Sequence, residues 1–483
     1  MSDSRTFHQL TSYSPERPWY EPIDDPRITG GFVASDPALR PAAFKEYDEE
    51  LPTVELPVTL PRPGGSAAAV LSGGSGPARV PDLGHLARLL FRSAGVVRYR
   101  DTPDGPVRYR AVGSAGNRHP LEVYVVTAGL PGLPGGVWHH DPLGHRLRRV
   151  GPAPGDGPTF LVLTGVPWRS AWRYAERSWR HLWWDSGTVL SHLLALAADA
   201  GIPARVRLRF PDRLVGELVG AAEDREYPLV LLVLGAGEPA LRPARPAVPG
   251  RLPAAPAEFP LIGATHRATE AASGLWLTGR AEVAPGPPWA SWDSLDEVIA
   301  RRGSARRFDP DASLPASQLR WAMAVATRPV PWDAGPGLLT HHVVAHAVEP
   351  VDPGVYRWDG DLLPGTDGDQ REAAHRFCLG SDLARDAAYL VVHCADLAAT
   401  VDRLGERGYR AANVEAGIVK GRLHLAAHTL GHSASGMVFN DELVPAFLRA
   451  DTTGLLATVA GVPTHRAAPG GTPLDPTRLR RRL

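Results

Sequence analysis

The stretch Trp179–Gly201, WRHLWWDSGTVLSHLLALAADAG, returns 230 positions later as Tyr409–Gly431, YRAANVEAGIVKGRLHLAAHTLG. Apolar residues recur in both stretches at the spacing of one face of a long helix. Related residues stand at the same offset throughout: Trp179 and Tyr409, Arg180 and Arg410, Asp185 and Glu415, Gly187 and Gly417, Leu193 and Leu423, Ala197 and Ala427, and Gly201 and Gly431. A constant offset through a whole helix indicates an internal duplication.

A second set of matching residues lies upstream of these two helices. Val125-Val126 and Val343-Val344 are 218 positions apart, and so are Gly136-Val137 and Gly354-Val355. The β-branched and aromatic residues around them are typical of strands. Each half therefore mixes a few strands with long helices, which predicts an α+β fold made of two homologous domains.

The composition changes along the chain and predicts five segments. The first 60 residues are rich in Pro, Asp, Tyr and Trp without a sustained period, which indicates an extended arm lying over a domain. A later stretch rich in Pro, Ala and Gly is typical of a linker. The predicted segments are an arm (1–60), a first domain (61–238), a linker (239–288), a second domain (289–470) and a basic tail (471–483).

Charge and cysteine content exclude several classes of protein. The 483 residues carry 52 basic and 52 acidic side chains, so a basic nucleic-acid-binding protein is not indicated. No apolar run is long enough for a membrane helix, and the first ten residues lack the pattern of a secretory signal. Cys378 and Cys394 are the only cysteines, which fits a reducing cytoplasm. Lys45 and Lys420 are the only lysines.

The segment Arg301–Phe308, RRGSARRF, has the composition of a phosphate cradle between two predicted helices. Arginine forms forked, charge-assisted hydrogen bonds to phosphate oxygens, and a serine hydroxyl adds a donor. The candidate phosphate-binding residues are Arg301, Arg302, Ser304 and Arg306. The alternative is a solvated basic turn, and the segment alone does not decide between the two.

The two halves have lost complementary segments. The counterpart of the arginine segment in the first half is about residues 72–78, which contain no arginine. Conversely, the Gly-rich loop Ser114–Pro120 corresponds to about residues 332–338, which lack its pattern. This pattern predicts a single site between the halves, with arginines from the second domain. The first domain would supply the loop residues Ser114, Ala115, Gly116 and Asn117.

Several of these segments together resemble a known family. They are Ser114–Val126, Leu133–Pro142, Trp172–His181, Arg301–Phe308 and Gly461–Arg466, with Phe7–Tyr13 as a lead-in. The chain resembles the SagB/ThcOx-type (McbC-like) dehydrogenases of the nitroreductase superfamily, in the tandem-domain form of thiopeptide and azole-peptide pathways. The resemblance implies two fused nitroreductase-like domains, each an antiparallel sheet flanked by helices, that form an intramolecular pseudo-dimer.

The same resemblance implies a cofactor, a reaction and partners. FMN would lie at the pseudo-dimer interface, with Ser435 and Gly436 facing its ring and Arg466 reaching its phosphate. Such enzymes oxidise thiazoline and oxazoline rings to azoles in ribosomally made peptides. The expected partners are a precursor peptide, a cyclodehydratase and other peptide-modifying enzymes, and a homodimer of the pseudo-dimer stays open.

The family's acid/base element, a Lys-Tyr pair after a tryptophan, is altered here to Arg173-Tyr174. Arginine stays protonated and is a poor general base. We therefore expect Tyr174 to transfer the proton, with its pKa lowered by the charge of Arg173. Packing of Tyr174 beside a surface Arg173 is the alternative, and His119 and His181 are then the next candidate bases.

Other polar residues have less specific patterns. Asp185 either caps its helix or orders Arg180 and the Gly-rich loop. Three histidines at helical spacing (His424, His428 and His432) have metal-like spacing but no supporting cysteine, so no metal is predicted. We expect the remaining histidines near the second-half strands to be structural: His341, His342, His346 and His393.

Two other functions remain open from the sequence. One is an NAD(P)H-dependent flavin enzyme that reduces nitro compounds or quinones, which needs no Rossmann motif. The other is a scaffold without flavin that presents a peptide to partner enzymes, and the intact segment Arg301–Arg307 argues against it.

Overall fold

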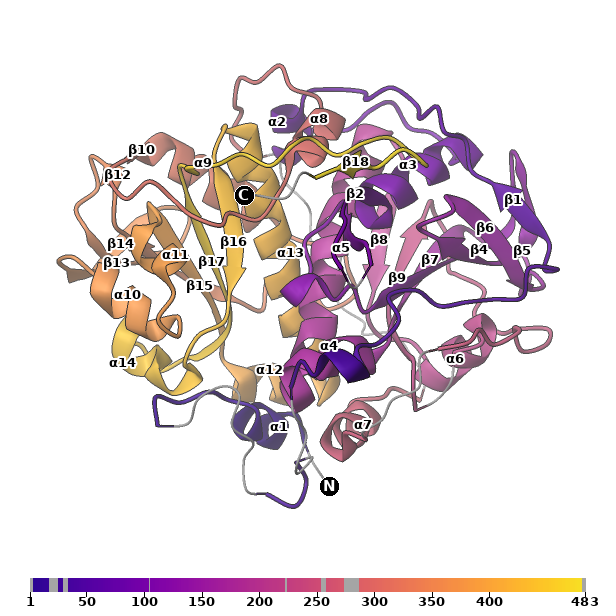
Figure 1. Cartoon of the computed structure of the whole chain (residues 1–483), viewed down its shortest axis with the longest axis horizontal. Coiled ribbons are helices and arrows are strands. Elements are labelled where there is room, and N and C mark those ends of the chain that lie inside the picture. Colours follow the sequence, from indigo (N-terminus) through magenta and orange to yellow (C-terminus); the bar gives the residue numbers. More distant parts are fainter. Residues whose placement is uncertain are drawn as a thin grey trace.

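Two antiparallel sheets, one from each half of the chain, lie on either side of a pair of long helices (Figure 1). The structure is a computed structural model that describes residues 3–16, 25–28, 34–103, 105–221, 224–252, 258–272 and 286–479. Parts of the predicted arm (1–2, 17–24 and 29–33), of the predicted linker (253–257 and 273–285) and of the basic tail (480–483) lie outside the described residues.

The first sheet has the strand order β1-β6-β5-β4-β7-β9-β8, with every neighbouring pair antiparallel. Its long central strands are buried on both faces because helices and the arm cover them. The strands are β1 (Thr53–Glu55), β4 (Leu121–Leu130), β5 (Leu133–Asp141), β6 (Arg146–Gly151), β7 (Thr159–Gly165), β8 (Ala204–Arg207) and β9 (Tyr227–Leu234).

The second sheet has the order β14-β13-β11-β15-β17-β16, also antiparallel throughout. It matches the first sheet strand for strand, apart from the added edge strand β1. The strands are β11 (Thr340–Ala345), β13 (Gly354–Trp358), β14 (Leu362–Asp367), β15 (Tyr389–Ala395), β16 (Ser433–Met437) and β17 (Thr453–Gly461).

Residue pairing confirms the duplication at the level of register. Val126 pairs with Val137 in the first sheet, and their counterparts 218 positions later, Val344 and Val355, pair in the second. A shift of one residue would turn every side chain to the other face, so equal register is a strict test. The predicted α+β class and the tandem arrangement are confirmed.

The two long helices, α5 (Ser178–Asp199) and α13 (Arg407–Thr429), cross at equivalent glycines. A Cβ atom on Gly187 would lie 2.2 Å from the carbonyl oxygen of Val414, and one on Gly417 would lie 2.3 Å from that of Trp184. Only glycine permits this backbone approach. Because the two glycines are 230 positions apart, the crossing lies on the pseudo-twofold axis that relates the halves.

A second contact on this axis joins the starts of two short helices, α2 (Ala67–Leu71) and α8 (Leu295–Arg301). Ser66 and Ser294 are the N-caps of these helices and form an isolated antiparallel bridge with each other. Ser294 forms a full capping box with Glu297. The arginine segment follows α8 directly, so the axis fixes its position.

The remaining helices flank the sheets or connect them. In the first half they are α3 (Leu83–Ala94), α4 (Pro167–Tyr174) and α6 (Asp212–Val219). In the second half they are α9 (Ala316–Ala326), α10 (Arg371–Phe377), α11 (Asp382–Asp386), α12 (Leu397–Leu404) and α14 (Val444–Leu448). Two small sheets complete the fold: β18 (Thr477–Arg478) with β2 (Val96–Arg100) and β3 (Val107–Arg110), and β10 (Leu314–Pro315) with β12 (Val348–Glu349).

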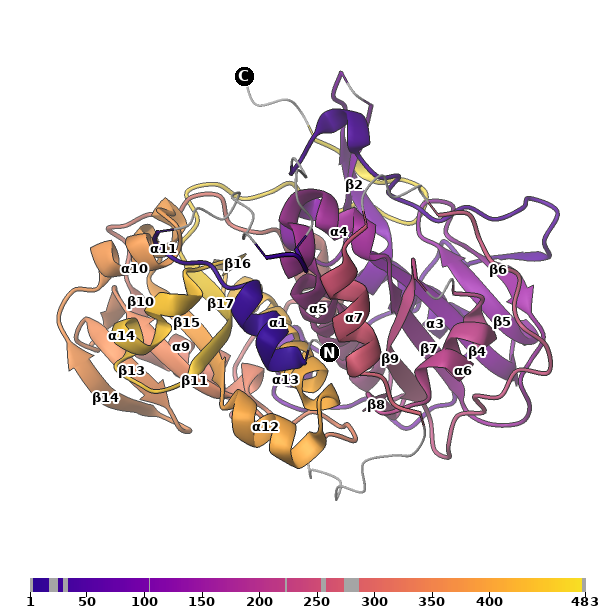
Figure 2. The same cartoon turned by 90° about the horizontal axis from the view of Figure 1, so that it is seen from below.

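The arm contains a helix, α1 (Ser4–Leu10), that lies under the pair of long helices (Figure 2). Phe7 is fully buried, with its ring 5.0 Å from that of Trp179 in an edge contact. Arg180 donates to the His8 carbonyl and to Thr11 Oγ1, and it also pairs with Asp441 from the second half at 2.8 Å. The arm is therefore anchored by both halves.

The predicted linker contains a matching helix, α7 (Pro260–Ala268), next to α1 (Figure 2). Arg410, the counterpart of Arg180, donates to the His266 carbonyl at 2.7 Å and to Thr269 Oγ1 at 2.7 Å. It also pairs with Asp212 from the first half at 2.7 Å. The spacing of histidine and threonine is the same in both helices, so α7 is a second copy of the arm helix rather than a spacer.

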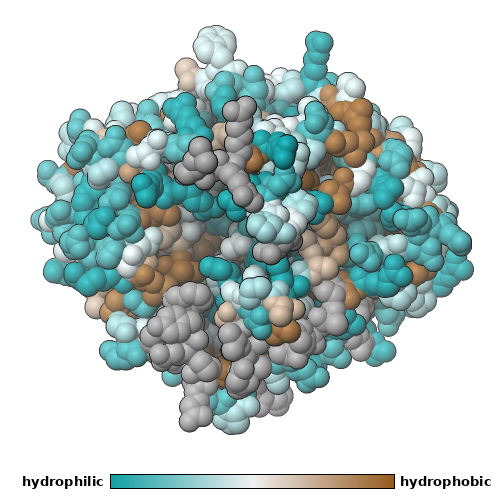
Figure 3. Space-filling view, viewed as in Figure 1, coloured by the Kyte–Doolittle hydropathy of each residue, from teal (hydrophilic) through white to brown (hydrophobic). Residues whose placement is uncertain are grey.

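The surface is mainly hydrophilic on the face shown in Figure 3, where apolar side chains appear in patches near the middle and toward the upper right. Within the described ranges, no helix is both long and apolar enough to cross a membrane.

Candidate functional site

The Gly-rich loop of the first half is held by Asp185 in the second turn of α5. Ser114 Oγ donates to the Asp185 carboxylate at 2.5 Å, and the Ala115 amide donates to it at 3.3 Å. The His119 amide in turn donates to Ser114 Oγ at 2.9 Å. Of the two roles considered for Asp185, ordering the loop is the one the geometry shows.

The loop adopts a backbone conformation that few residues tolerate. Gly116, Asn117 and His119 have φ angles of 56°, 58° and 45°. Left-handed backbone in non-glycine residues costs free energy and is concentrated at functional sites. A Cβ atom on Gly116 would lie 2.7 Å from the Tyr174 hydroxyl, so glycine is required here for space as well. The loop thus places the small 3₁₀ turn Ala115–Asn117 against Tyr174.

The arginine segment of the second half meets this loop. Arg302 is 5% exposed, and its Nε donates to the Ala111 carbonyl at 2.7 Å. A Cβ atom on Gly113 would lie 3.4 Å from Arg302 Nη1 and 3.6 Å from Ser304 Oγ. The two segments that the halves retain separately are therefore side by side in space.

Arg302 is a buried cation with no carboxylate partner among the described residues. Its Nη1 is buried and lacks a hydrogen-bond partner there. Burial and the neighbouring Arg98 and Arg306 lower the pKa of Arg302 to about 9. Burying an unpaired charge is costly, so the site is suited to an anion that is not part of the protein. A phosphate group fits this requirement.

The histidines around Arg302 do not supply that anion or a metal site. Burial lowers the pKa of His192 to about 3 and that of His428 to about 4, so both are neutral near pH 7. His428 Nε2 accepts from the Gly303 amide at 3.2 Å, while His432 contacts Gln318 at 2.6 Å. The described part of the chain holds no group of three or more His, Cys, Asp or Glu residues that could hold a metal ion.

Lys420 on α13 is a site residue that the motifs did not indicate. Its side chain is buried, and a Cβ atom on Gly436 would lie 3.3 Å from its Cε and 3.7 Å from its Nζ. Burial lowers the pKa of Lys420, while the Asp185 carboxylate opposes this shift. The chain has 50 arginines (52 basic residues minus two lysines), so a lysine is rare in it. This rarity is the sequence signal that could have marked Lys420 as a candidate site residue. Both lysines prove to be buried.

Only some of the other predicted cofactor residues lie near the arginine segment and the Gly-rich loop. Ser435 and Gly436 lie on β16, and Ser304 forms a parallel bridge with Ala434, so this strand adjoins the arginine segment. Arg306 and Arg466 are exposed. Arg301 points elsewhere and pairs with Asp293 at 2.6 Å. The structure thus brings together Arg302, Ser304, Ser114–Asn117 and Gly436, but not Arg301.

Tyr174 ends α4, and its ring packs at a tilt of 51° against a buried histidine. Its ring lies 4.1 Å from that of His181, whose two nitrogens have no hydrogen-bond partner among the described residues. Burial raises the pKa of Tyr174 above its ordinary value, although the charge of Arg173 acts in the opposite direction. The charge of Arg173 thus lowers the pKa of Tyr174 as expected, but burial outweighs this effect and the net shift is upward. Burial also keeps His181 neutral by lowering its pKa well below the usual value.

The equivalent site on the other side of the axis is filled. A Cβ atom on Gly73 would lie 2.4 Å from Arg328 Nη2, and Arg328 Nη1 donates to the Leu71 carbonyl at 2.9 Å. Glu415, the counterpart of Asp185, accepts from the Leu338 amide at 2.7 Å. The loop-holding carboxylate is thus retained, whereas the space of the arginine segment is taken by Arg328.

Comparisons with known proteins agree with this architecture. No family model matches the chain. A crystal structure of a putative nitroreductase from Anabaena variabilis superposes with a TM-score of 0.74 at 24% sequence identity, covering 95% of this chain and 99% of that one. Putative nitroreductase MJ1384 of Methanocaldococcus jannaschii is 24% identical over 168 residues, which are 32% of this chain and 80% of that protein. The fold is the nitroreductase fold, present twice in one chain.

Proposed function

We propose that this protein is an FMN-dependent oxidoreductase with one flavin held between its two halves. The observation that supports this most directly is the buried, unpaired Arg302 from the second half against the Gly113–Asn117 loop from the first. The contact joins the two halves of a chain that contains the nitroreductase fold twice, which supports a flavin site at the pseudo-dimer interface. An FMN phosphate would supply the anion that Arg302 lacks.

The residues around this contact divide into two groups by chemistry. Arg302 and Ser304 would hold the phosphate, with the exposed Arg306 and Arg466 closing over it from the surface. The backbone of Ser114–Asn117 and of Ser435-Gly436 would face the ring, near the amino group of Lys420. When bound, FMN accepts or donates a hydride, and the protein's part is positioning and proton transfer.

We further propose that the substrate is an azoline ring in a ribosomally made peptide, oxidised to an azole. The resemblance of the Ser114–Val126 and Trp172–His181 segments to SagB-type dehydrogenases supports this choice. Aromatisation removes one proton and one hydride from the ring, and FMN, when bound, would accept the hydride. The Tyr174 hydroxyl, beside Gly116 and Arg173, would handle the proton. The precursor peptide and a cyclodehydratase are the proposed partners.

One observation favours a second candidate, a flavin enzyme that reduces nitro compounds or quinones with NAD(P)H. Burial raises the pKa of Tyr174, so its phenol is neutral near pH 7. A neutral phenol can donate a proton but accepts one poorly. Proton donation suits a reduction, whereas oxidation of an azoline needs a base, for which the neutral His181, packed against the Tyr174 ring, is a candidate.

Two measurements test these proposals. The visible spectrum of the purified protein and the mass of the released cofactor test FMN directly; a colourless protein that takes up no added FMN contradicts the flavin assignment. The flavin-loaded protein is then given an azoline peptide, or NAD(P)H with a quinone. A loss of 2 Da per ring supports the dehydrogenase, while NAD(P)H consumption without that loss supports the reductase.

A further inference from the structure

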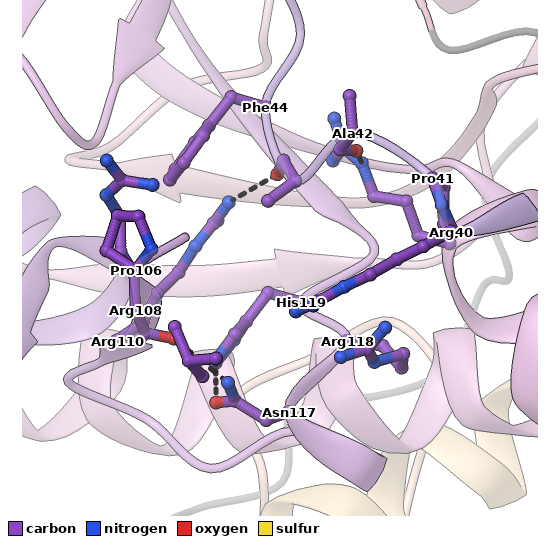
Figure 4. A pocket seen from close by; sticks show the side chains of 13 residues that line it. Arg40, Pro41, Ala42, Phe44, Pro106, Arg108, Arg110, Asn117, Arg118 and His119 are labelled. Carbon is purple, nitrogen blue, oxygen red and sulfur yellow. Dashed lines mark hydrogen bonds between the residues drawn. The ribbon is translucent and has the colours of Figure 1, made fainter. Parts of the chain in front are cut away.

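A cavity of about 60 Å³ lies between arm residues 40–44, strand β3 and the Ser114–Pro120 loop (Figure 4). One water molecule needs only about 10–15 Å³ of such space, so the cavity has room for a small ion. Its wall contains five arginines and a histidine: Arg40, Arg108, Arg110, Arg118, Arg169 and His119. In Figure 4, Arg40 and Arg110 reach toward the same space from opposite sides, with His119 between them.

The positive charge in this wall is not balanced by the protein. Four of the five arginines form no ion pair with any residue that the structure describes: Arg40, Arg108, Arg110 and Arg118. The fifth, Arg169, donates to Glu122 through Nη1 at 2.5 Å, and Glu122 also contacts His139 at 2.8 Å. Arg169 is 1% exposed, and its Nη2 is buried without a partner. Besides Glu122, Asp141 is the one acidic group acting on Arg110.

The guanidinium groups are held in place by neutral contacts instead. Arg110 donates to the carbonyls of Leu121 and Ala43, at 3.2 and 3.5 Å. The Phe44 ring lies 5.7 Å from the guanidinium carbon of Arg108 and 5.5 Å from that of Arg110. Such contacts orient the cations without neutralising them. Burial lowers the pKa of the buried Arg110 and of the half-buried Arg118 to about 10, which is the direction that a cation without a carboxylate partner shows when it is removed from water.

We propose that this cavity binds one small anionic group, a carboxylate or a phosphate, carried by the molecule on which the enzyme acts. As an anchor for the substrate, this inference rests on the proposed function. The Ser114–Pro120 loop links this cavity to Tyr174. Asn117 and His119 line the cavity, while Gly116 packs against the Tyr174 hydroxyl. An acidic group bound here would hold the rest of the ligand against the face of the loop that carries Tyr174.

The test is anion binding by the full-length protein, measured by calorimetry at constant ionic strength with inorganic phosphate and, separately, with acetate. The protein is first loaded with any FMN that it accepts, so that the probe anion does not bind at the Arg302 site. We expect saturable binding of one anion per chain. Tighter binding of phosphate would identify the anionic group as a phosphate, and tighter binding of acetate would identify it as a carboxylate. The variants Arg110→Met and Arg108→Met should raise the Kd for the anion roughly 10- to 100-fold, which is the scale of lost hydrogen bonds to a charged group.

Two controls separate this proposal from the flavin assignment. Arg100→Met, an exposed arginine on the adjacent strand β2, should bind the anion like the unaltered protein. The side chain of Arg108 makes no hydrogen bond or ion pair with the described residues, so its variant should fold even if Arg110→Met does not. Absence of saturable binding by either probe, or equal binding by Arg108→Met and the unaltered protein, would overturn the proposal. Binding that persists in a protein unable to hold FMN would support the anion site while rejecting the flavin.

Discussion

At the scale of single residues, Arg302 determines whether the interface can hold an anion. Its charge is buried, and Arg98 beside it, 4% exposed, donates to the Arg302 carbonyl at 3.1 Å and so adds a second cation. A bound phosphate would satisfy both the unpaired Nη1 and the local excess of charge.

Replacing Arg302 by Met should therefore weaken FMN binding while keeping most of the side-chain volume. The loss of a charged hydrogen-bond donor costs about 1.5–3 kcal/mol, which corresponds to roughly 10- to 150-fold in Kd. Flavin content after extensive dialysis, followed by fluorescence titration with FMN, measures the effect. Arg79→Ala, an exposed residue at the end of the first-half counterpart, is the control and should bind FMN normally. Equal flavin content in both variants would contradict the phosphate assignment.

Tyr174 is the residue whose removal tests proton transfer. Tyr174→Phe retains the ring that packs against His181, so folding and flavin content should stay unchanged. The turnover rate should fall by about 10²–10⁴, the usual contribution of a positioned acid or base. Arg173→Lys introduces the lysine of the Lys-Tyr pair in the SagB-type enzymes that the sequence resembles, and it should remain active. A normal turnover rate for Tyr174→Phe would show that Arg173 and Tyr174 have a structural role. His119 and His181 would then be the next candidate bases to test.

Glu415 should make stability depend on pH. Burial raises the pKa of this carboxyl from 4.5 to about 7, so the folded state binds more protons than the unfolded state between those values. The contribution of Glu415 to stability is therefore expected to fall by up to about 3 kcal/mol as pH rises from about 4.5 to 7. Buried histidines such as His192 and His428, whose pKa values are lowered, contribute stability that rises over the same range, so the Glu415 contribution is measured as a difference between proteins. Glu415→Gln can still accept the Leu338 amide hydrogen bond, and between pH 5 and 7.5 its free energy of unfolding should gain relative to that of the unaltered protein. Denaturant unfolding at both pH values measures this difference, and the exposed Glu372→Gln is the control that should parallel the unaltered protein.

At the scale of elements, the close crossing of α5 and α13 depends on two glycines. Gly187→Ala would place a methyl group 2.2 Å from a backbone oxygen, so the helices must move apart. Overpacking of this kind costs about 1–3 kcal/mol or more. Gly216→Ala in α6 is the matched control, because its added methyl group would meet only Pro228 Cγ at 3.8 Å. Denaturant midpoints of both variants test this, and an unchanged midpoint for Gly187→Ala would contradict the packing argument.

The periodic parts of the fold could be predicted from the sequence, and the irregular ones could not. The long helices, the central strands and their duplication follow from apolar spacing and constant offsets, and α5 begins within two residues of its predicted start. Helix α7 was missed because nine residues among many prolines show too little periodicity. Its identity depends on His266 and Thr269, whose meaning appears only once Arg410 is seen to contact them.

The site divides in the same way. Complementary loss of two segments indicated that Arg302 and the Ser114 loop come together, because each half retains what the other lacks. The orientation of Arg301 toward Asp293 was not predictable, since it depends on a residue eight positions earlier that the helix brings close. The raised pKa of Tyr174 was also beyond the sequence, because it depends on how deeply the phenol is buried.

At the scale of the whole molecule, two related interfaces exist, but only one combines the arginine segment with the Gly-rich loop, and Arg328 lies against Gly73 at the other. We therefore expect one FMN per chain. Quantifying the released flavin against protein concentration measures the ratio. A ratio near two would show that Arg328 can leave the space beside Gly73, and it would contradict the complementary-loss argument. Arg328→Ala should not by itself create a second site, because the first half supplies no arginine segment there.

The filling of one interface by Arg328 also has a genetic consequence. In a homodimer, both subunits are translated from one gene, so a substitution that closes one site closes its symmetry mate as well. Joining two copies in a single chain removes this constraint, because each copy can then mutate alone. The guanidinium beside Gly73 is a change that only a fused pair can carry without losing the site at Arg302.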